Sequence, residues 1–122
     1  MAYNVLVMAL KSVCPYRTGN LERNGIRVKI SNGSMCVEIG HDTSKVLGEY
    51  AVYTNEPWIS PKWGGKQNPN QGWIEQGIEK ALPLIRQVYS GMTIDDFNDL
   101  MDDLQKQTAT RQAEIRRKRK NV

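Results

Sequence analysis

The dipeptide Asn32-Gly33 constrains the fold more than any other feature of the sequence. Asn-Gly is the pair favoured in a type I′ turn, because both central residues of that turn need positive φ. Apolar and polar residues alternate on either side of the turn, as in strands that bury one face. A two-residue loop fixes the register, which sets Arg27 opposite Glu38 on the polar face. The sequence therefore predicts an antiparallel hairpin over residues 26–39.

The apolar face of this hairpin needs a cover, because an isolated hairpin is only marginally stable. We expect that cover to be an amphipathic helix over residues 69–90, with Asn68 as its N-cap and Gln71 completing a capping box. Pro83 predicts a kink, since proline removes a backbone hydrogen bond and crowds the preceding turn. Gly91 supplies the stop. The apolar stripe consists of Ile74, Ile78, Ala81, Leu82, Ile85, Val88 and Tyr89.

Two more helices are expected, one at each end of the chain. Residues 3–13 have helical periodicity and are ended by Pro15. Thr93 caps a final helix with Asp96 at the box position. The apolar stripe of that helix is Phe97, Leu100, Met101 and Leu104. Few apolar residues follow, so we expect the helix to start docked and then to fray or project outward.

The segments between the hairpin and the long helix are less regular. Residues 46–54 suit either a third strand or a short helix, and their pattern does not decide between the two. Residues 56–72 are rich in Pro, Gly and Asn and predict a loop. The predicted fold class is therefore α+β, with a small antiparallel sheet packed on a kinked helix. Residues 1–91 form the α+β domain, and residues 92–122 form an extended C-terminal helix with a basic tail.

Charge is distributed unevenly along the chain. The 17 Lys and Arg exceed the 13 Asp and Glu by only four. The segment 95–103 nevertheless holds five aspartates and no base. The segment 111–120 holds one acid, Glu114, and six bases: Arg111, Arg116, Arg117, Lys118, Arg119 and Lys120. The sequence thus combines a polarised C-terminal tail with a nearly neutral body.

Several classes of protein are disfavoured by composition. No apolar run approaches the ~18 residues of a membrane-spanning helix, and no signal-peptide pattern is present, so we expect neither a membrane nor a secreted protein. Cys14 and Cys36 are expected to be reduced and at least half-buried. With His41 they match no zinc-ligand spacing. His41-Asp42 lacks a linked nucleophile, and the clustered aspartates lack a calcium-loop pattern, so we expect no catalytic or metal site and no cofactor.

The order of these segments resembles a known family, the small head–tail joining proteins of long-tailed bacteriophages, also called neck, tail-completion or minor capsid proteins. Two short motifs carry the resemblance: a Thr-Gly-x-Leu turn before the hairpin, at residues 18–21, and a Tyr-Ala-x-aromatic segment before a flexible loop and a helix, at residues 50–53. Residues 10–90 match the family's order of elements.

The resemblance implies a structural protein of the virion, not an enzyme. Family members assemble as rings, commonly of six or twelve copies, between the portal–adaptor complex and the tail tube or tail terminator. It therefore implies a location in the virion neck, and in the host cytoplasm during assembly. We expect the subunit and partner interfaces to use the loop and the C-terminal helix, with these residues: Trp58, Lys62, Trp63, Lys66, Phe97, Leu100, Met101 and Leu104.

The two loop tryptophans and the basic tail each have a second interpretation. Trp58 and Trp63 either order against a neighbouring subunit or fold back onto their own domain. The bases of segment 111–120 either contact packaged DNA, without sequence preference, or simply complement the helix dipole or an acidic neighbour. The alternative function is a small nucleic-acid-binding protein that uses this tail. A small hydrolase or nuclease is the weakest hypothesis.

Overall fold

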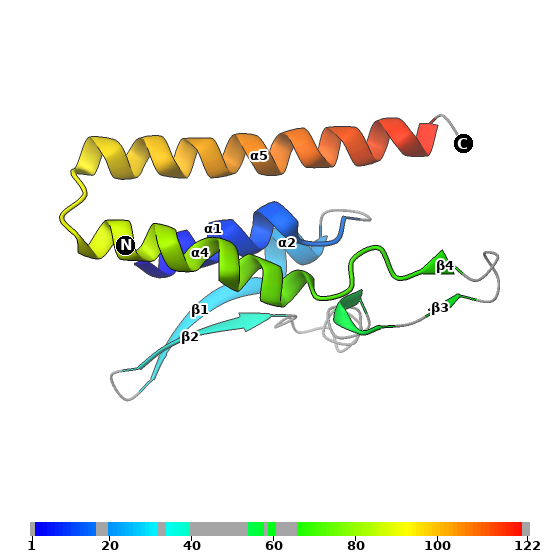
Figure 1. Ribbon diagram of the computed structural model, residues 1–122, viewed down its shortest axis with the longest axis horizontal. Coiled ribbons are helices and arrows are strands. Elements are labelled where there is room, and N and C mark those ends of the chain that lie inside the picture. The colour runs from blue at the N-terminus through cyan, green and yellow to red at the C-terminus, as the bar shows by residue number, and fades with distance from the viewer. Residues whose placement is uncertain are drawn as a thin grey trace.

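The computed structural model describes residues 2–16, 20–31, 34–39, 54–57, 59–60 and 66–120. In this part the chain is mostly helical with a small two-stranded antiparallel sheet, which is a small α+β fold (Figure 1). Its elements are α1 (Ala2–Val13), α2 (Asn20–Asn24), β1 (Ile26–Ser31), β2 (Ser34–Ile39), β3 (Ile59–Ser60), β4 (Lys66–Gln67), α4 (Trp73–Tyr89) and α5 (Ile94–Lys120).

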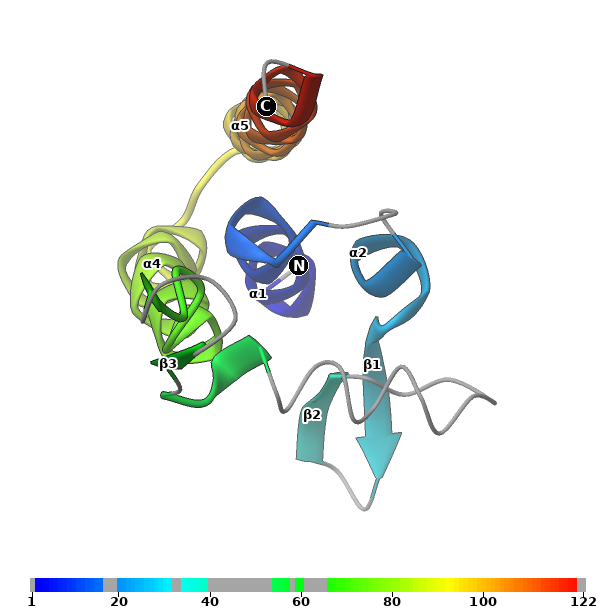
Figure 2. The ribbon, with the colours of Figure 1, turned by 90° about the vertical axis from the view of Figure 1, so that its right-hand side faces the viewer.

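Helix α1 is the centre of the molecule. Viewed end-on, it is surrounded by α4, α5, α2 and the hairpin (Figure 2). Its residues Val5 and Ala9 are fully buried, and Leu10 is 1% exposed. The N-terminal helix was predicted from its periodicity and is confirmed. Helix α1 is buried on several sides. Short side chains such as that of Ala9 let the neighbouring helices approach it closely.

The hairpin is confirmed in its predicted register. Ile26 is opposite Ile39, and Arg27 is opposite Glu38, with Arg27 Nε donating to Glu38 Oε2 over 3.1 Å. The cover differs from the expected one, because both strands lie against α1 while α4 packs extensively on α1. Helix α4 joins the same apolar cluster as Ile26 through its first residue, Trp73. The hairpin is therefore covered mainly by the first helix.

Helix α4 begins four residues later than predicted. Asn68 does not cap it. Asn68 Oδ1 instead accepts a hydrogen bond from Asn70 N over 2.9 Å, which closes a turn ahead of the helix. The N-cap is Gly72, in the left-handed region at φ 75° and with no side-chain cap. The predicted capping box with Gln71 is therefore wrong, because the local Asx turn competes successfully for the asparagine side chain.

The other end of α4 follows the prediction. The helix ends at Tyr89, and Gly91 adopts φ 99°, the left-handed conformation that terminates helices. Pro83 lies inside the helix, which continues on both sides of it. The kink expected at Pro83 stays a prediction.

Helix α5 starts as predicted and continues further. Thr93 Oγ1 accepts a hydrogen bond from Asp96 N over 3.1 Å, which confirms the N-terminal cap. The helix is continuous to Lys120 and runs beside α1 in the same direction, antiparallel to α4 (Figure 1). The expectation that it frays or projects after Leu104 is wrong. Polar contacts from its second half, described below, replace the missing apolar ones.

Two apolar clusters hold these elements together. One joins Leu10 and Cys14 of the first helix region to Leu21, Ile26 and Trp73. The other centres on Val5, Ala9 and Ala81, with half-buried residues of α4 and α5 packed around them. Helix α5 thus shares its interior with the segment predicted as a separate α+β domain. Each helix in the described part is too short or too polar to cross a lipid bilayer.

Candidate assembly surface

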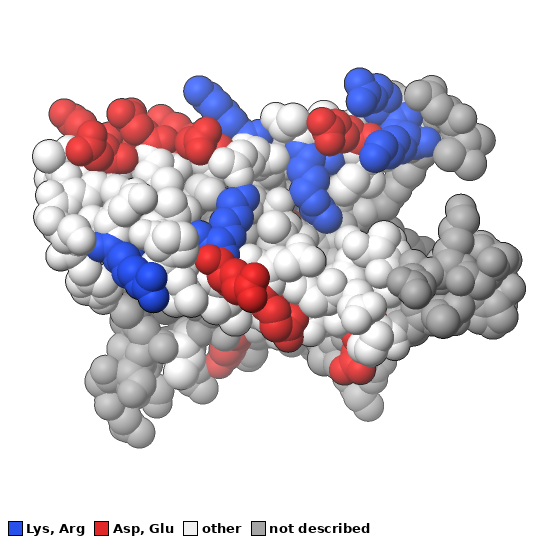
Figure 3. Space-filling model, viewed as in Figure 1, with Lys and Arg blue, Asp and Glu red and all other residues white. Residues whose placement is uncertain are grey.

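Helix α5 separates opposite charges along its length. Acidic side chains gather over its first half and basic ones toward its end (Figure 3). Leu104 is 1% exposed, and α5 packs against α1. With 3.6 residues per turn, the opposite side of the helix is a ridge formed by Asp95, Asp99, Asp102, Lys106, Thr110, Ala113 and Arg117. All members of this outer ridge are exposed.

Two of the predicted DNA-contacting bases have partners within the chain. The Arg111 guanidinium donates a hydrogen bond to the backbone oxygen of Cys14, just beyond the end of α1. Its burial lowers the pKa of Arg111. The Arg116 guanidinium lies 5.7 Å from the ring centroid of Tyr16, a cation–π contact. These contacts dock the second half of α5, and they leave Arg117 and Lys118 exposed.

The apolar stripe of α5 lies inside the molecule. Phe97, Leu100 and Met101 are half-buried and pack against the cluster of Val5, Ala9 and Ala81, while Leu104 is 1% exposed. These four were expected to contact other subunits. Because they pack within the chain, Leu104 is inaccessible to another subunit, and the other three are only partly accessible.

The predicted loop residues are mostly outside the described part of the structure. This holds for Trp58, Lys62 and Trp63, and also for His41. Lys66 belongs to β4, whose backbone pairs with β3. Their roles stay predictions.

Helix α4 exposes an apolar stripe that the sequence had assigned to the interior. Ile78 is 42% exposed, Leu82 47% and Tyr89 75%, and Ile94 at the start of α5 is 74% exposed. The side of α4 that faces α1 is instead made of small residues, Gly77 and Ala81. The predicted seven-residue stripe was too wide for one neighbouring helix to cover, which was the signal that part of it remains free.

A short segment ahead of the loop is tied to the start of α4. The backbone amide of Ile74 donates to Asn55 Oδ1 over 3.0 Å, so Asn55 serves as a cap supplied from outside the helix. Trp73 Nε1 donates to Thr54 Oγ1 over 3.2 Å. Asn68 Nδ2 donates to the backbone oxygens of Thr54 and Glu56, at 2.8 and 2.7 Å. The ends of the loop are therefore held close together by buried polar contacts.

A lysine links the three long helices. Lys80 Nζ of α4 donates to Ser12 Oγ of α1 over 2.8 Å and to Gln107 Oε1 of α5. Gln107 Nε2 in turn donates to Asp103 Oδ2 over 3.0 Å. Burial lowers the pKa of Lys80, and the charge of Asp103 partly offsets that effect. The hydrogen bond between Lys80 and Gln107 holds α5 beside α4, and neither residue belongs to the outer ridge.

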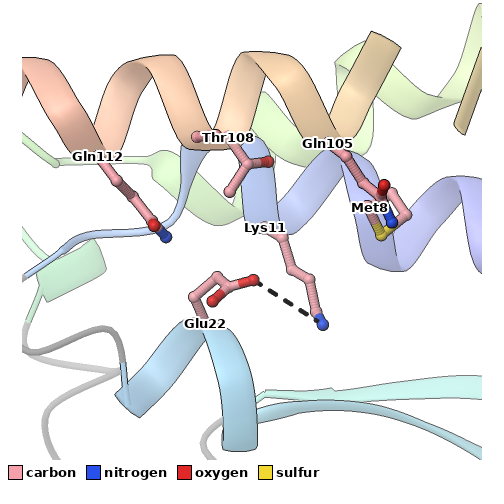
Figure 4. Close-up of a pocket in the computed structure, with 7 residues that line it drawn as sticks. Met8, Lys11, Glu22, Gln105, Thr108 and Gln112 are labelled. Carbon is pink, nitrogen blue, oxygen red and sulfur yellow. Dashed lines mark ion pairs between the residues drawn. The ribbon is translucent and has the colours of Figure 1, made fainter. Parts of the chain in front are cut away.

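A shallow cleft of about 210 Å³ lies between α1, α2 and α5 (Figure 4). Lys11 and Glu22 face each other across it, with Lys11 Nζ 3.9 Å from Glu22 Oε1. The remaining lining is neutral, from Met8, Gln105, Thr108, Ala109 and Gln112. The two charges satisfy each other, so the cleft offers a ligand no unpaired charge.

The described residues also bring together no metal-binding group of three or more His, Cys, Asp or Glu. Cys14 and Cys36 are both free thiols, Cys14 buried and Cys36 exposed, so the expectation of burial is wrong for Cys36. Burial raises the pKa of Cys14 from 9.0 to about 12, which keeps the thiol protonated and unreactive at neutral pH.

We find no match to this chain among protein-family models, curated protein sequences or solved structures.

Proposed function

We propose that the chain is a structural subunit of a bacteriophage neck, where copies assemble into a ring that joins the DNA-filled head to the tail. The observation that supports this most is the exposed apolar stripe of α4, formed by Ile78, Leu82 and Tyr89. Contiguous apolar residues rimmed by charged ones are typical of protein interaction sites. The similarity of residues 10–90 to the head–tail joining family supplies the biological setting.

The surfaces suit partners of two kinds. The apolar stripe fits a protein surface, and Tyr89 is a residue type enriched among those that dominate interface energies. The kink proposed at Pro83 would divide this stripe and set the direction in which Tyr89 points. The portal–adaptor complex and the tail tube or terminator are the partners proposed for these faces, together with neighbouring copies of the chain. The loop tryptophans, Trp58 and Trp63, are proposed to order against the same partners.

The proposal is tested by disabling the gene in the phage that encodes the chain. We expect infected cells to accumulate filled heads and separate, complete tails, and the intact gene supplied from a plasmid to restore joined particles. A Leu82→Asp variant should fail to restore them, while an Asn98→Asp variant on the exposed side of α5 should succeed. Normal virions from the disabled phage would contradict the proposal.

Nucleic-acid binding is the second candidate, and the exposed Arg117 and Lys118 favour it. Phosphate contacts of this kind are independent of sequence and weaken steeply with salt. The test is binding of duplex DNA to the full chain and to a chain lacking residues 110–122. Two results together would favour the second candidate over the first. DNA affinity would have to disappear when residues 110–122 are removed, and virion assembly would have to stay normal when the gene is disabled.

A further inference from the structure

We infer that the outer ridge of α5 binds a second copy of this chain, with the two α5 helices antiparallel. The inference rests on the charge pattern of the ridge and stands independently of the joining role. It concerns a side of α5 that the internal packing leaves free, since the helix contacts α1 through the opposite side.

The ridge has an acidic end, a nearly neutral middle and a basic end. Asp95, Asp99 and Asp102 form the acidic end, and Arg117 lies at the basic end. At 1.5 Å per residue, about 33 Å separates Asp95 from Arg117 along the helix. That separation exceeds the Debye length of ~10 Å at 0.1 M salt. The two ends therefore cannot neutralise each other within one chain.

An antiparallel second copy brings opposite charges together at both ends of the pair. The acidic end of each α5 then faces the basic end of the other, and the same contact occurs twice about a two-fold axis. A parallel copy in register would place like charges together. A parallel copy shifted along the axis would leave one acidic and one basic end free, and would lead to an open chain of subunits. The two-fold pair brings the opposite ends together with two copies alone, whereas a head-to-tail contact needs a complete ring to do so.

One register also resolves the middle of the ridge. Setting Asp102 opposite the second copy's Arg117 sets Lys106 opposite Ala113, keeps the two Lys106 side chains apart and leaves Asp95 beyond the end of the second copy's α5. The centre of the pair then falls between Ala109 and Thr110, whose small exposed side chains allow the helices to approach.

The same ridge suits nucleic acid less well. A duplex lying along α5 would bring its phosphates against Asp95, Asp99 and Asp102 as well as against Arg117. A second copy uses both signs of charge, whereas DNA uses one and is repelled by the other. Complementary charge therefore favours the protein partner along the full ridge.

The experiment uses two full-length charge variants and measures mass by light scattering at 50 mM salt over a range of concentrations. The first variant, Asp99→Lys with Asp102→Lys, leaves Asp95 as the one acidic residue of the ridge. The second, Arg117→Glu with Lys118→Glu, makes the former basic end acidic and leaves Lys106 as the one basic residue of the ridge. All changed positions are exposed, and circular dichroism spectra checked against wild type establish that both variants are folded.

We expect wild type to associate at 50 mM salt, with its dissociation constant rising at least tenfold at 500 mM. Each variant alone should remain a monomer, and an equimolar mixture should associate again. A monomeric wild type at all concentrations, association retained by either variant alone, or a mixture that stays monomeric would overturn the inference.

A cross-linking measurement locates the contact within any assembly that forms. In a Cys36→Ser background, Thr110→Cys lies near the expected centre of the pair, and Gln76→Cys on the exposed side of α4 serves as the control. We expect oxidation to cross-link the Thr110→Cys chain at least tenfold faster than the control. If larger assemblies form and contain this cross-link, the antiparallel pair is present within them. Equal cross-linking rates for the Thr110→Cys chain and the Gln76→Cys control would overturn the inference. DNA binding with no cross-link would assign the ridge to nucleic acid and overturn it as well.

Discussion

Gly77 of α4 lies directly against Leu10 of α1. A side-chain carbon added at Gly77 would lie 2.6 Å from Leu10 Cδ2 and 3.1 Å from Leu10 Cα. Leu10 is 1% exposed, so it has no room to withdraw. This contact between α1 and α4 therefore depends on the absence of a side chain at Gly77.

Gly77→Ala should destabilise the protein despite the better helix propensity of alanine. The propensity gain of about 1 kcal/mol is smaller than the strain of overpacking, about 1–3 kcal/mol, especially because a backbone atom is among the neighbours. The difference between the two effects predicts that the free energy of unfolding in urea falls by up to about 2 kcal/mol. Gln76→Ala, one residue away and exposed, is the control. Equal stability of the two variants would contradict the close packing.

Leu104→Ala tests whether α5 belongs to the folded interior. Leu104 is 1% exposed, and truncating such a leucine costs about 2–5 kcal/mol. Leu82→Ala, at a residue that is 47% exposed, should cost less than about 1.5 kcal/mol. Urea unfolding of both variants gives the comparison. If α5 were undocked, the Leu104 variant would lose no more than the Leu82 variant.

Asn68→Asp tests the polar tie between the loop and α4. Aspartate keeps the oxygen that accepts from Asn70 but cannot donate to the backbone oxygens of Thr54 and Glu56. Losing donors to a buried site costs about 1–3 kcal/mol. Hydrogen exchange should show faster exchange at the Gly72 amide, which donates to Asn55 O. Asn98→Asp makes the same chemical change at an exposed position of α5, away from these hydrogen bonds. It should leave hydrogen exchange at the Gly72 amide unchanged.

The buried Cys14 thiol predicts a loss of stability in alkali. Burial raises its folded-state pKa from 9.0 to about 12, despite the attraction of Arg111. The unfolded chain therefore releases this proton first, so stability is full below pH 9 and falls between pH 9 and 12, by at most about 1.4 kcal/mol per pH unit.

Unfolding of wild type and Cys14→Ala, compared over that range, isolates this contribution. Lys80 has the opposite effect on stability. Its pKa is lowered by burial, so the cost of burying its charge disappears as pH rises and the ammonium loses its proton. This effect is the same in both proteins. We expect the stability difference between the two proteins to shrink as pH rises. A constant difference would contradict the burial of the thiol.

Local rules predicted the elements whose determinants are close in sequence. The register of the hairpin and the Thr93 cap each depend on a few neighbouring residues. The start of α4 could not be predicted in this way. The N-cap position is Gly72, the side chain that accepts from the Ile74 amide comes from the distant Asn55, and Asn68 is used in a turn. Local pattern carries no information about such long-range competition.

The arrangement of the helices depends on residues with weak sequence signals. Ala9, Gly77 and Ala81 mark where helices meet, but small residues contribute little to an apolar stripe. The large residues Ile78 and Leu82 were therefore assigned to the interior. The docking of the second half of α5 depends on Arg111, which as a charged residue is expected at the surface.

The most direct test of the proposed role is immunogold labelling of purified virions with antibodies against this chain, viewed by electron microscopy. The account predicts gold at the junction of head and tail, and none on particles from a phage whose gene is disabled. Gold distributed over the head shell, or virions that carry none, would contradict it.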